Sequence, residues 1–249
     1  MKTFYLLFGS LFLICHAAHA QFHLKANLQN MHLWRGMEVS SGMVLTTDLS
    51  YSLCNGHLVA GLWGGMNSRG SYKEFNHYLE LYYRRFKLAF WDTYNFSPGA
   101  AYNNSEYFNY KAKETGRFLD ATLSYSISDR FPLSISASTL LFGRDRDEAN
   151  RKNRYSTFLF VSYPISMKKG WVITPGIGTA FACSPGRDSE GHFSKAHFYG
   201  DEWGIVHVSL SASYSFSLFD HPLPLTACAM WNPQSNKGFF QLGVCLFSF

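Results

Sequence analysis

Charged residues are scarce in this chain, at 16% of 249 residues, whereas aromatic residues reach 18%. Soluble domains carry about 25% charged residues, so this composition is unusual for one. The formal net charge of +5 is small and scattered along the chain, which argues against a nucleic-acid partner. The shortage of charge and the surplus of aromatic rings favour contact with lipid instead.

Beyond residue 20 the sequence also lacks any run of about 18 apolar residues, which argues against a membrane-spanning helix. The first twenty residues have a lysine, an apolar core and then Ala-His-Ala, the pattern of a cleaved secretory signal peptide. We therefore expect residues 1–20 to be removed and residues 21–249 to form one domain.

Cysteine motifs are absent as well. The four cysteines that follow the expected signal peptide form no CxxC pair and have no histidine at metal-ligand spacing: Cys54, Cys183, Cys228 and Cys245. Three disulfide pairings are open to them, and small apolar thiols are the simpler interpretation. The sequence thus predicts no metal site and no cofactor.

Alternation of apolar and polar residues is the dominant pattern. In residues 206–219, valine, leucine, tyrosine and phenylalanine fall on even positions and serine falls on odd ones, so the two faces of a strand would differ. This run far exceeds the usual strand length of about 5 to 6 residues. Twelve segments of this kind are found, at 22–34, 43–53, 57–66, 77–86, 86–96, 117–127, 133–142, 155–163, 171–182, 206–219, 225–231 and 238–249.

The connections between these segments alternate between tight turns and long polar loops, the longest at 97–116 and 184–202. Short turns on one side and long loops on the other are typical of bacterial outer-membrane barrels. Closure is required in lipid, because an open sheet edge leaves backbone groups unpaired. The sequence predicts an all-β, transmembrane, up-and-down antiparallel β-barrel of about twelve strands, with ten or fourteen as alternatives, in the outer membrane.

Aromatic residues suggest how such a barrel meets its surroundings. Five tryptophans fall in the outer halves of their strands and are expected to form an interfacial girdle: Trp34, Trp63, Trp91, Trp203 and Trp231. The chain ends in CLFSF, and a last amphipathic strand ending at Phe249 resembles the signal read by the barrel-assembly machinery. The expected partners are that machinery, outer-membrane lipids, lipopolysaccharide and small solutes or ions.

Small polar residues are expected to line the lumen. The predicted lining comprises Asp120, Thr122, Ser124, Ser126, Ser134, Ser136, Ser138, His207, Ser209, Ser211, Ser213 and Ser215. Hydroxyl groups both donate and accept hydrogen bonds, so such a wall can hold water. The expected function is a channel for ions or small solutes; an interior plugged by one of the two long loops is the alternative.

Two other functions remain open at this stage. His207 and Ser209 project to the same face of a strand, and with Glu202 or Asp201 they could form the catalytic group of an outer-membrane lipid hydrolase acting on phospholipid or lipid A. Serine fills every alternate position here, however, so the pair can arise without selection. A non-conducting structural or adhesion barrel is the third possibility.

Three short motifs in the first third of the chain resemble a known family. LWRG at 33–36, GLWGG at 61–65 and LELYY at 79–83 are similar to the opening of the TorF-like porin family of Bacteroidetes-type outer-membrane barrels. The resemblance implies a channel-forming barrel and extends to Trp34, Arg35, Gly36, Gly61, Trp63 and Glu80. Residues 37–45 lack a clear counterpart of the family's loop.

Overall fold

The structure, a computed structural model, describes residues 21–218 and 221–249; the expected signal peptide lies outside the described residues. It consists of β-strands and two short 3-10 turns, η2 (Cys54–Gly56) and η3 (Lys168–Gly170). No helix among the described residues is long and apolar enough to cross a membrane. The twelve main strands are β1 (Gln21–Trp34), β2 (Met37–Leu53), β3 (Leu58–Asn67), β4 (Lys73–Tyr83), β5 (Phe86–Asn95), β6 (Arg117–Ser126), β7 (Ser134–Gly143), β8 (Ser156–Ser162), β10 (Val172–Ala182), β13 (Gly204–Leu218), β14 (His221–Asn232) and β15 (Lys237–Ser248).

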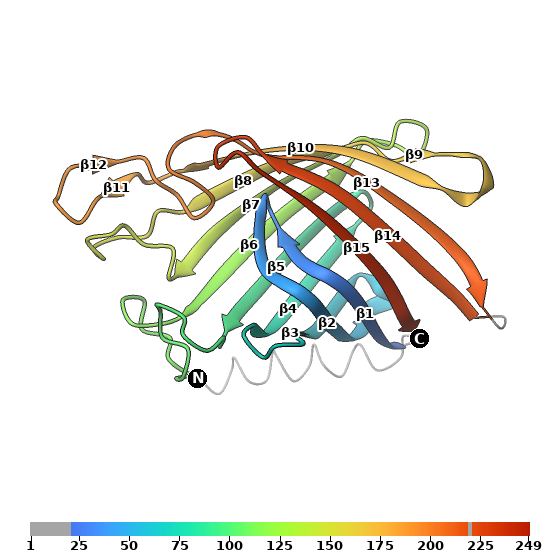
Figure 1. The fold of residues 1–249 in the computed structure, drawn as a ribbon, viewed down its shortest axis with the longest axis horizontal. Helices are drawn as coiled ribbons and strands as arrows, with labels where there is room; N and C mark the ends of the chain where they lie inside the picture. Colours follow the sequence, from blue (N-terminus) through green and yellow to red (C-terminus); the bar gives the residue numbers. More distant parts are fainter. Residues whose placement is uncertain (1–20, 219–220) are drawn as a thin grey trace.

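Each main strand pairs antiparallel with the next along the chain, and β15 pairs with β1, so the sheet closes on itself (Figure 1). The two-residue strand β9 (Ile165–Ser166) continues the line of β8 by pairing with β10. A separate two-stranded ribbon, β11 (Gly186–Arg187) and β12 (Phe193–Ser194), lies in the connection between β10 and β13. The predicted up-and-down antiparallel barrel of about twelve strands is confirmed.

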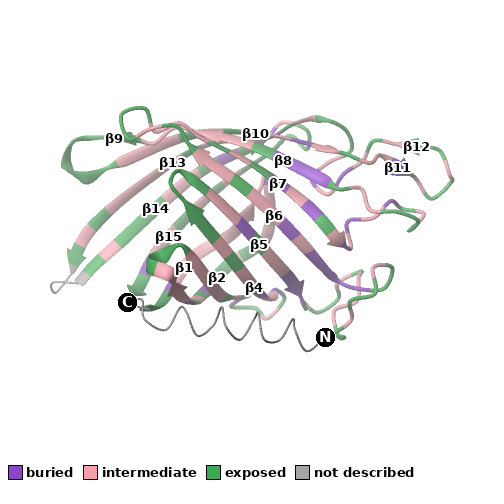
Figure 2. Cartoon of the chain, turned by 180° about the vertical axis from the view of Figure 1, so that it is seen from behind, coloured by how far each residue is buried: buried purple, intermediate pink, exposed green. Residues whose placement is uncertain are grey.

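Side chains alternate between the two faces of the wall, as the period-2 pattern predicts. On β5, for example, Ala89 and Thr93 are buried on the inner face, whereas the ring of Phe90 is 41% exposed on the outer face. Figure 2 shows the same alternation of exposed with buried or half-buried residues along many strands. Large apolar side chains thus cover the outside of the barrel, whereas the inside holds polar and small side chains together with a group of aromatic rings.

Turn length sorts the connections onto two rims. At the short-turn rim, β4 and β5 are joined by two residues, and η2 and η3 make two of the other turns. At the long-loop rim, β5 is joined to β6 by residues 96–116 and β10 to β13 by residues 183–203. The structure differs from expectation at residues 35–42, predicted to be a loop, because β2 already begins at Met37. Met37 and Val39 alternate with Glu38 and Ser40, but this run of four residues is too short to indicate a strand by itself.

The end of the β1–β2 hairpin leaves the barrel wall. β1 pairs with β15 up to Gln29, and β2 pairs with β3 from Val44 onward. Among the described residues, those between these limits pair as strands only with each other, up to Trp34 opposite Met37. We call residues 30–43 the inner hairpin, since its tip contacts β6 and β13 across the lumen. Figure 1 shows β1 and β2, in blue, diverging from the line of β15.

Local irregularities explain how the inner hairpin departs. The register of β1 against β2 shifts between Gln29 and Met31 and again between His32 and Leu33, and such bulges bend a strand. At the point of departure the Asn30 side chain replaces backbone partners: it donates to the Phe240 carbonyl at 3.0 Å and accepts from the Leu242 amide at 2.8 Å. These bonds satisfy backbone groups of β15 that the departing strand would leave unpaired.

Candidate functional site: a divided lumen

Arg35 lies at the tip of the inner hairpin and is bound to the opposite wall. Its guanidinium donates two hydrogen bonds to the carboxylate of Asp120 on β6, at 2.5 and 3.2 Å. It also donates to the hydroxyl of Thr122 at 3.1 Å and to that of Tyr199 at 2.8 Å. Both charged side chains are largely buried. A bidentate arginine–carboxylate pair fixes orientation as well as distance, so the tip is held firmly against β6.

Aromatic rings surround the same tip. The Trp34 ring lies 5.6 Å from that of Phe118, 5.9 Å from that of Phe198 and 5.5 Å from that of Tyr199, measured between ring centroids. Arg35 lies over the Trp34 ring at 4.6 Å. The rings come from the hairpin, from β6 and from the connection before β13. This contact makes the tip part of the buried core around Phe158, Ala180, Tyr199 and Val206.

Gly36 brings the tip against β13 and β14. Its φ angle is +86°, and a Cβ atom added there would lie 2.0 Å from the carbonyl oxygen of Val206. The carbonyl of Gly36 accepts a hydrogen bond from the side-chain amide of Asn232 at 3.0 Å. Both the left-handed backbone and the close approach require glycine at this position.

The connection before β13 holds Phe198 and Tyr199 through a buried polar network. Asp145 accepts hydrogen bonds from the amide and the hydroxyl of Ser156, both at 2.7 Å. The Ser156 hydroxyl in turn accepts from the amide of Phe198 at 2.8 Å. Burial raises the pKa of Asp145, while the bonds from Ser156 lower it, and the net direction is upward. Asp145 therefore links the β7–β8 connection to the rings that meet the hairpin tip.

Replacing Asp145 with alanine should destabilise the folded barrel. The carboxylate is 2% exposed, and its removal leaves two buried donors of Ser156 without an acceptor, at about 1–3 kcal/mol each. The denaturant midpoint of refolded protein measures the loss. Asp129→Ala is the control, because Asp129 pairs with Arg85 at an exposed turn, where solvent screens the ion pair, and its loss should leave the midpoint nearly unchanged. Equal midpoints for the two variants would contradict this role of Asp145.

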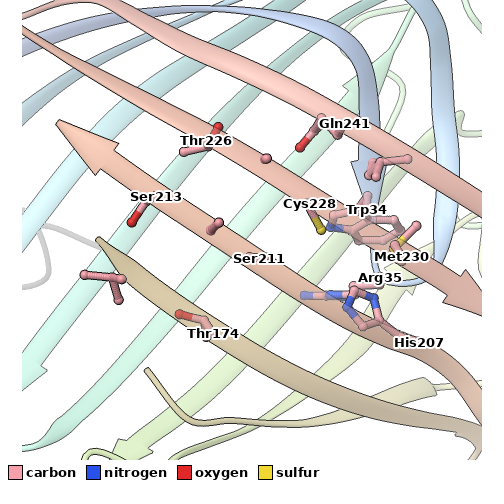
Figure 3. A pocket seen from close by; sticks show the side chains of 14 residues that line it. Trp34, Arg35, Thr174, His207, Ser211, Ser213, Thr226, Cys228, Met230 and Gln241 are labelled. Atoms are coloured by element: carbon pink, nitrogen blue, oxygen red, sulfur yellow. The ribbon is translucent and has the colours of Figure 1, made fainter. Parts of the chain in front are cut away.

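Two cavities lie on either side of the hairpin tip. The first, of about 320 Å³, is bounded by β10, β13, β14 and β15, and its lining combines four hydroxyl-bearing residues with several apolar side chains. Figure 3 shows Trp34, Arg35 and Met230 grouped at one end of it, with Thr174 and Ser213 toward the other. The lining also contains Cys228, Thr226 and Gln241.

The second cavity, of about 540 Å³, lies between the inner hairpin and the wall formed by β3 to β6. It extends along β4 from Glu74, near the long-loop rim, to Glu80, near the short-turn rim. Trp34 and Arg35 line both cavities. The hairpin tip therefore divides the lumen into two chambers.

Five of the twelve residues predicted to line the lumen border one of the two cavities. Asp120 and Thr122 line the second cavity, and His207, Ser211 and Ser213 line the first. Thr122 donates a hydrogen bond to Ser138 at 2.8 Å across β6 and β7. The other predicted residues have these cross-strand partners: Ser124 lies opposite Ser136, Ser126 opposite Ser134, Ser209 opposite Gly176 and Ser215 opposite Pro224.

Three of the five tryptophans expected in an interfacial girdle lie inside the barrel instead. Trp34, Trp63 and Trp91 line the second cavity. Trp203 and Trp231 are 70% and 47% exposed, as expected of the outside. The prediction used only position along the strand, which does not determine which face a ring occupies when both faces of the strand carry apolar residues.

The connection at 97–116 was one of two candidates to plug the lumen, and much of it lies against the outer face of the wall. Arg117 is fully buried there: it donates to Asp92 at 2.7 Å and to the carbonyl of Tyr107 at 2.7 Å. Tyr110 donates to Asp92 at 2.6 Å. Since Phe118 points into the second cavity, its neighbour Arg117 points outward. The inner hairpin, with Phe198 and Tyr199 from the other connection, obstructs the lumen instead.

His207 and Ser209, the pair proposed for lipid hydrolysis, are in contact. The Nε2 atom of His207 lies 2.8 Å from the Ser209 hydroxyl. The Nδ1 atom is buried and has no hydrogen-bond partner among the described residues. Glu202 interacts elsewhere, with its backbone carbonyl accepting from His197 at 2.9 Å. The structure thus brings together two members of the suggested catalytic group and leaves the third apart.

The residues on which the resemblance to the TorF-like family was based lie at the hairpin tip and on the wall that faces it. Trp34, Arg35 and Gly36 form the hairpin tip, and Trp63 and Glu80 line the facing wall. Gly61 lies beneath the ring of Tyr78, since a Cβ atom there would be 2.2 Å from that ring. Within residues 21–218 and 221–249 no group of three or more potential ligands is placed to hold a metal ion, and the four cysteines form no disulfide with one another.

Comparison with known proteins adds little to this geometry. No family model matches the chain, and no curated protein matches it, so neither comparison supports the TorF-like resemblance. Among solved structures, a mutant of the porin from Rh. blastica matches with 12% sequence identity and a TM-score of 0.38. The match covers 83% of this chain and 55% of that porin, so the chain spans about half the length of the porin it matches. Such a distant likeness carries no information about what enters the lumen.

Proposed function

We propose that this protein is an outer-membrane channel for ions or small polar solutes. The outer face supports the location, because large apolar side chains on successive strands are exposed there, among them Leu62, Phe90, Leu123, Leu210 and Leu242. Exposed aromatic residues lie at both rims, as in the girdles of outer-membrane barrels: Tyr83, Phe86 and Trp171 at the short-turn rim, and Trp203 and Trp231 at the long-loop rim.

The polar lumen on both sides of one constriction is the observation that carries the proposal. Hydroxyl and charged groups in such chambers can hold water and ions, which an apolar interior would exclude. Here the chambers meet at Trp34 and Arg35, which makes the hairpin tip the limiting part of a path. We therefore propose a narrow channel whose conductance is set by the inner hairpin.

Planar-bilayer recording of refolded residues 21–249 tests the function. Discrete, reproducible current steps are expected, small for a barrel of twelve strands because the tip obstructs the lumen. Reversal potentials under a salt gradient then measure charge selectivity. Absence of steps from protein shown to be folded by its gel mobility would contradict the channel.

The resemblance, the chain end and the outer rim suggest three further assignments. We propose that the chain is a TorF-like barrel, supported by the position of the shared residues on the lumen side. We also propose that the last strand is recognised by the barrel-assembly machinery and that the outer rim contacts lipopolysaccharide. The end of the chain is accessible, since Phe249 is 77% exposed while its amide donates to the Leu24 carbonyl at 3.0 Å.

Lipid hydrolysis is a second candidate, favoured by the 2.8 Å contact between His207 and Ser209. It is opposed by the lack of a group that orients the His207 ring and by the position of the pair inside the barrel, away from acyl chains. Ser209→Ala should therefore leave the phospholipid and lipid A of a producing strain unchanged by mass spectrometry. Ser211→Ala, two residues along the same face, is the control. A product that disappears with Ser209 alone would establish the hydrolase.

A further inference from the structure

The second cavity has an aromatic wall built from β3, β4 and β5. The Trp63 ring lies against its own strand over Gly65, where a Cβ atom would be 2.6 Å from the ring. Tyr78 lies over Gly61 in the same way, and the Trp91 ring stacks on Tyr78 with centroids 4.4 Å apart and planes 15° apart. Glycine therefore lets these rings lie flat on the wall. We call Trp63, Tyr78 and Trp91 the aromatic platform.

Both tryptophans of the aromatic platform are half-buried and line the cavity, so part of each indole surface is accessible to a molecule inside it. Stacking of a ligand needs such rings, and it needs them held in place before the ligand arrives. The stack of Trp91 on Tyr78 and the fit of Trp63 over Gly65 supply that rigidity.

The charges around the same cavity nearly balance, with three cations, Arg35, Lys87 and Arg144, and four carboxylates, Glu38, Glu74, Glu80 and Asp120. Arg35 is paired with Asp120, and Lys87 donates to Glu80 at 3.1 Å. Glu74 accepts from the side-chain amides of Asn76 at 2.8 Å and Asn95 at 3.2 Å. The near balance of charge leaves many hydrogen-bonding atoms but only a small net charge, which favours a ligand that is polar and uncharged.

One donor at the long-loop end of the cavity lacks a partner. The Nε atom of Arg144 is buried and makes no hydrogen bond to the described residues, and the guanidinium lies 3.9 Å over the ring of Tyr102. Leaving a buried donor without an acceptor is energetically unfavourable. A ligand oxygen at this end of the cavity would remove that cost.

From this arrangement we infer that the second cavity binds a neutral saccharide. Flat rings stack on the C–H faces of a sugar, and its hydroxyls both donate to carboxylates such as Glu74 and accept from donors such as Arg144. The volume of about 540 Å³ falls within the range of about 300–1,000 Å³ typical of small-molecule sites. This inference deepens the proposed function, since it names the solute class that the channel selects.

Titration calorimetry of maltose with the folded protein in detergent tests the inference, because it measures binding without requiring conduction. Saturable binding is expected for the full chain. Trp91→Leu and Trp63→Leu should each weaken it about 2- to 10-fold, the effect expected for loss of one aromatic contact. The matched controls are Trp203→Leu and Trp231→Leu, which remove tryptophans from the outer face and should leave the affinity unchanged.

The remaining outcomes test the saccharide site and the channel function separately. Conduction without binding of maltose, lactose or sucrose would overturn the saccharide site and leave the channel in place. Binding without conduction would support the site and contradict the channel. If sodium glutamate binds the folded protein and the sugars do not, the site selects charged solutes and the inference is wrong. Equal weakening by inner and outer tryptophan variants would likewise contradict it.

Discussion

Replacing Arg35 with alanine should increase the single-channel conductance severalfold. The guanidinium occupies the boundary between the two chambers and ties the hairpin tip to Asp120, Thr122 and Tyr199. Its loss removes the obstruction directly and also releases the tip. The lumen at this point then carries the unpaired charge of Asp120, so selectivity should shift toward cations. Conductance steps and reversal potentials in a planar bilayer measure both effects.

Two further variants separate opening from misfolding. Arg35→Ala leaves a buried carboxylate without its counter-charge, which costs about 3–5 kcal/mol, whereas the double variant Arg35→Ala/Asp120→Ala removes both charges. The double variant should therefore keep the larger conductance, recover stability and lose the shift toward cations. Arg85→Ala is the control, because Arg85 pairs with Asp129 at the exposed short-turn rim. Wild-type conductance in both Arg35 variants would show that the tip does not limit the path.

The barrel could be predicted from the sequence because its determinant is local. A strand with one apolar face requires only alternation, and residues such as those of β13 display it without reference to the rest of the chain. The inner hairpin could not be predicted in this way. Met37 and Val39 alternate with Glu38 over too few residues to indicate a strand, and the sequence pattern does not distinguish a hairpin inside the barrel from an exposed loop.

Only part of the chemistry of the lumen could be predicted from the sequence, for a similar reason. Alternation identified the face that carries Asp120, and the resemblance drew attention to Arg35, yet the two residues are 85 positions apart and their pairing depends on barrel closure. Phe198 and Tyr199 lie in an irregular connection that offers no periodic signal. The tryptophans of the lumen were assigned to the outside because tryptophan is statistically common at the membrane interface. The glycines that accommodate Trp63 and Tyr78 inside the barrel act through contacts between neighbouring residues and strands, which the sequence pattern does not reveal.

Gly36→Ala should open the channel by steric means alone, with no change in charge. The new Cβ atom would lie 2.0 Å from the Val206 carbonyl oxygen, and a contact that short cannot persist, so the tip must move away from β13. Movement also strains the bond from Asn232 and draws Trp34 away from its ring contacts. Conductance should rise as in Arg35→Ala, while charge selectivity changes much less because Arg35 and Asp120 both remain.

Gly42→Ala provides a matched control within the same hairpin. Gly42 also has a left-handed backbone, at φ +78° against +86° for Gly36, so alanine costs about 1–2 kcal/mol of backbone strain at either site. No atom lies within 4 Å of the Cβ position at Gly42, so the tip keeps its place. A rise in conductance confined to Gly36→Ala would identify contact of the tip with β13 as the closing interaction. Equal rises in conductance in the two variants would attribute the effect to backbone strain in the hairpin. No rise in either variant would mean that ions pass by a route that the position of the hairpin tip does not control.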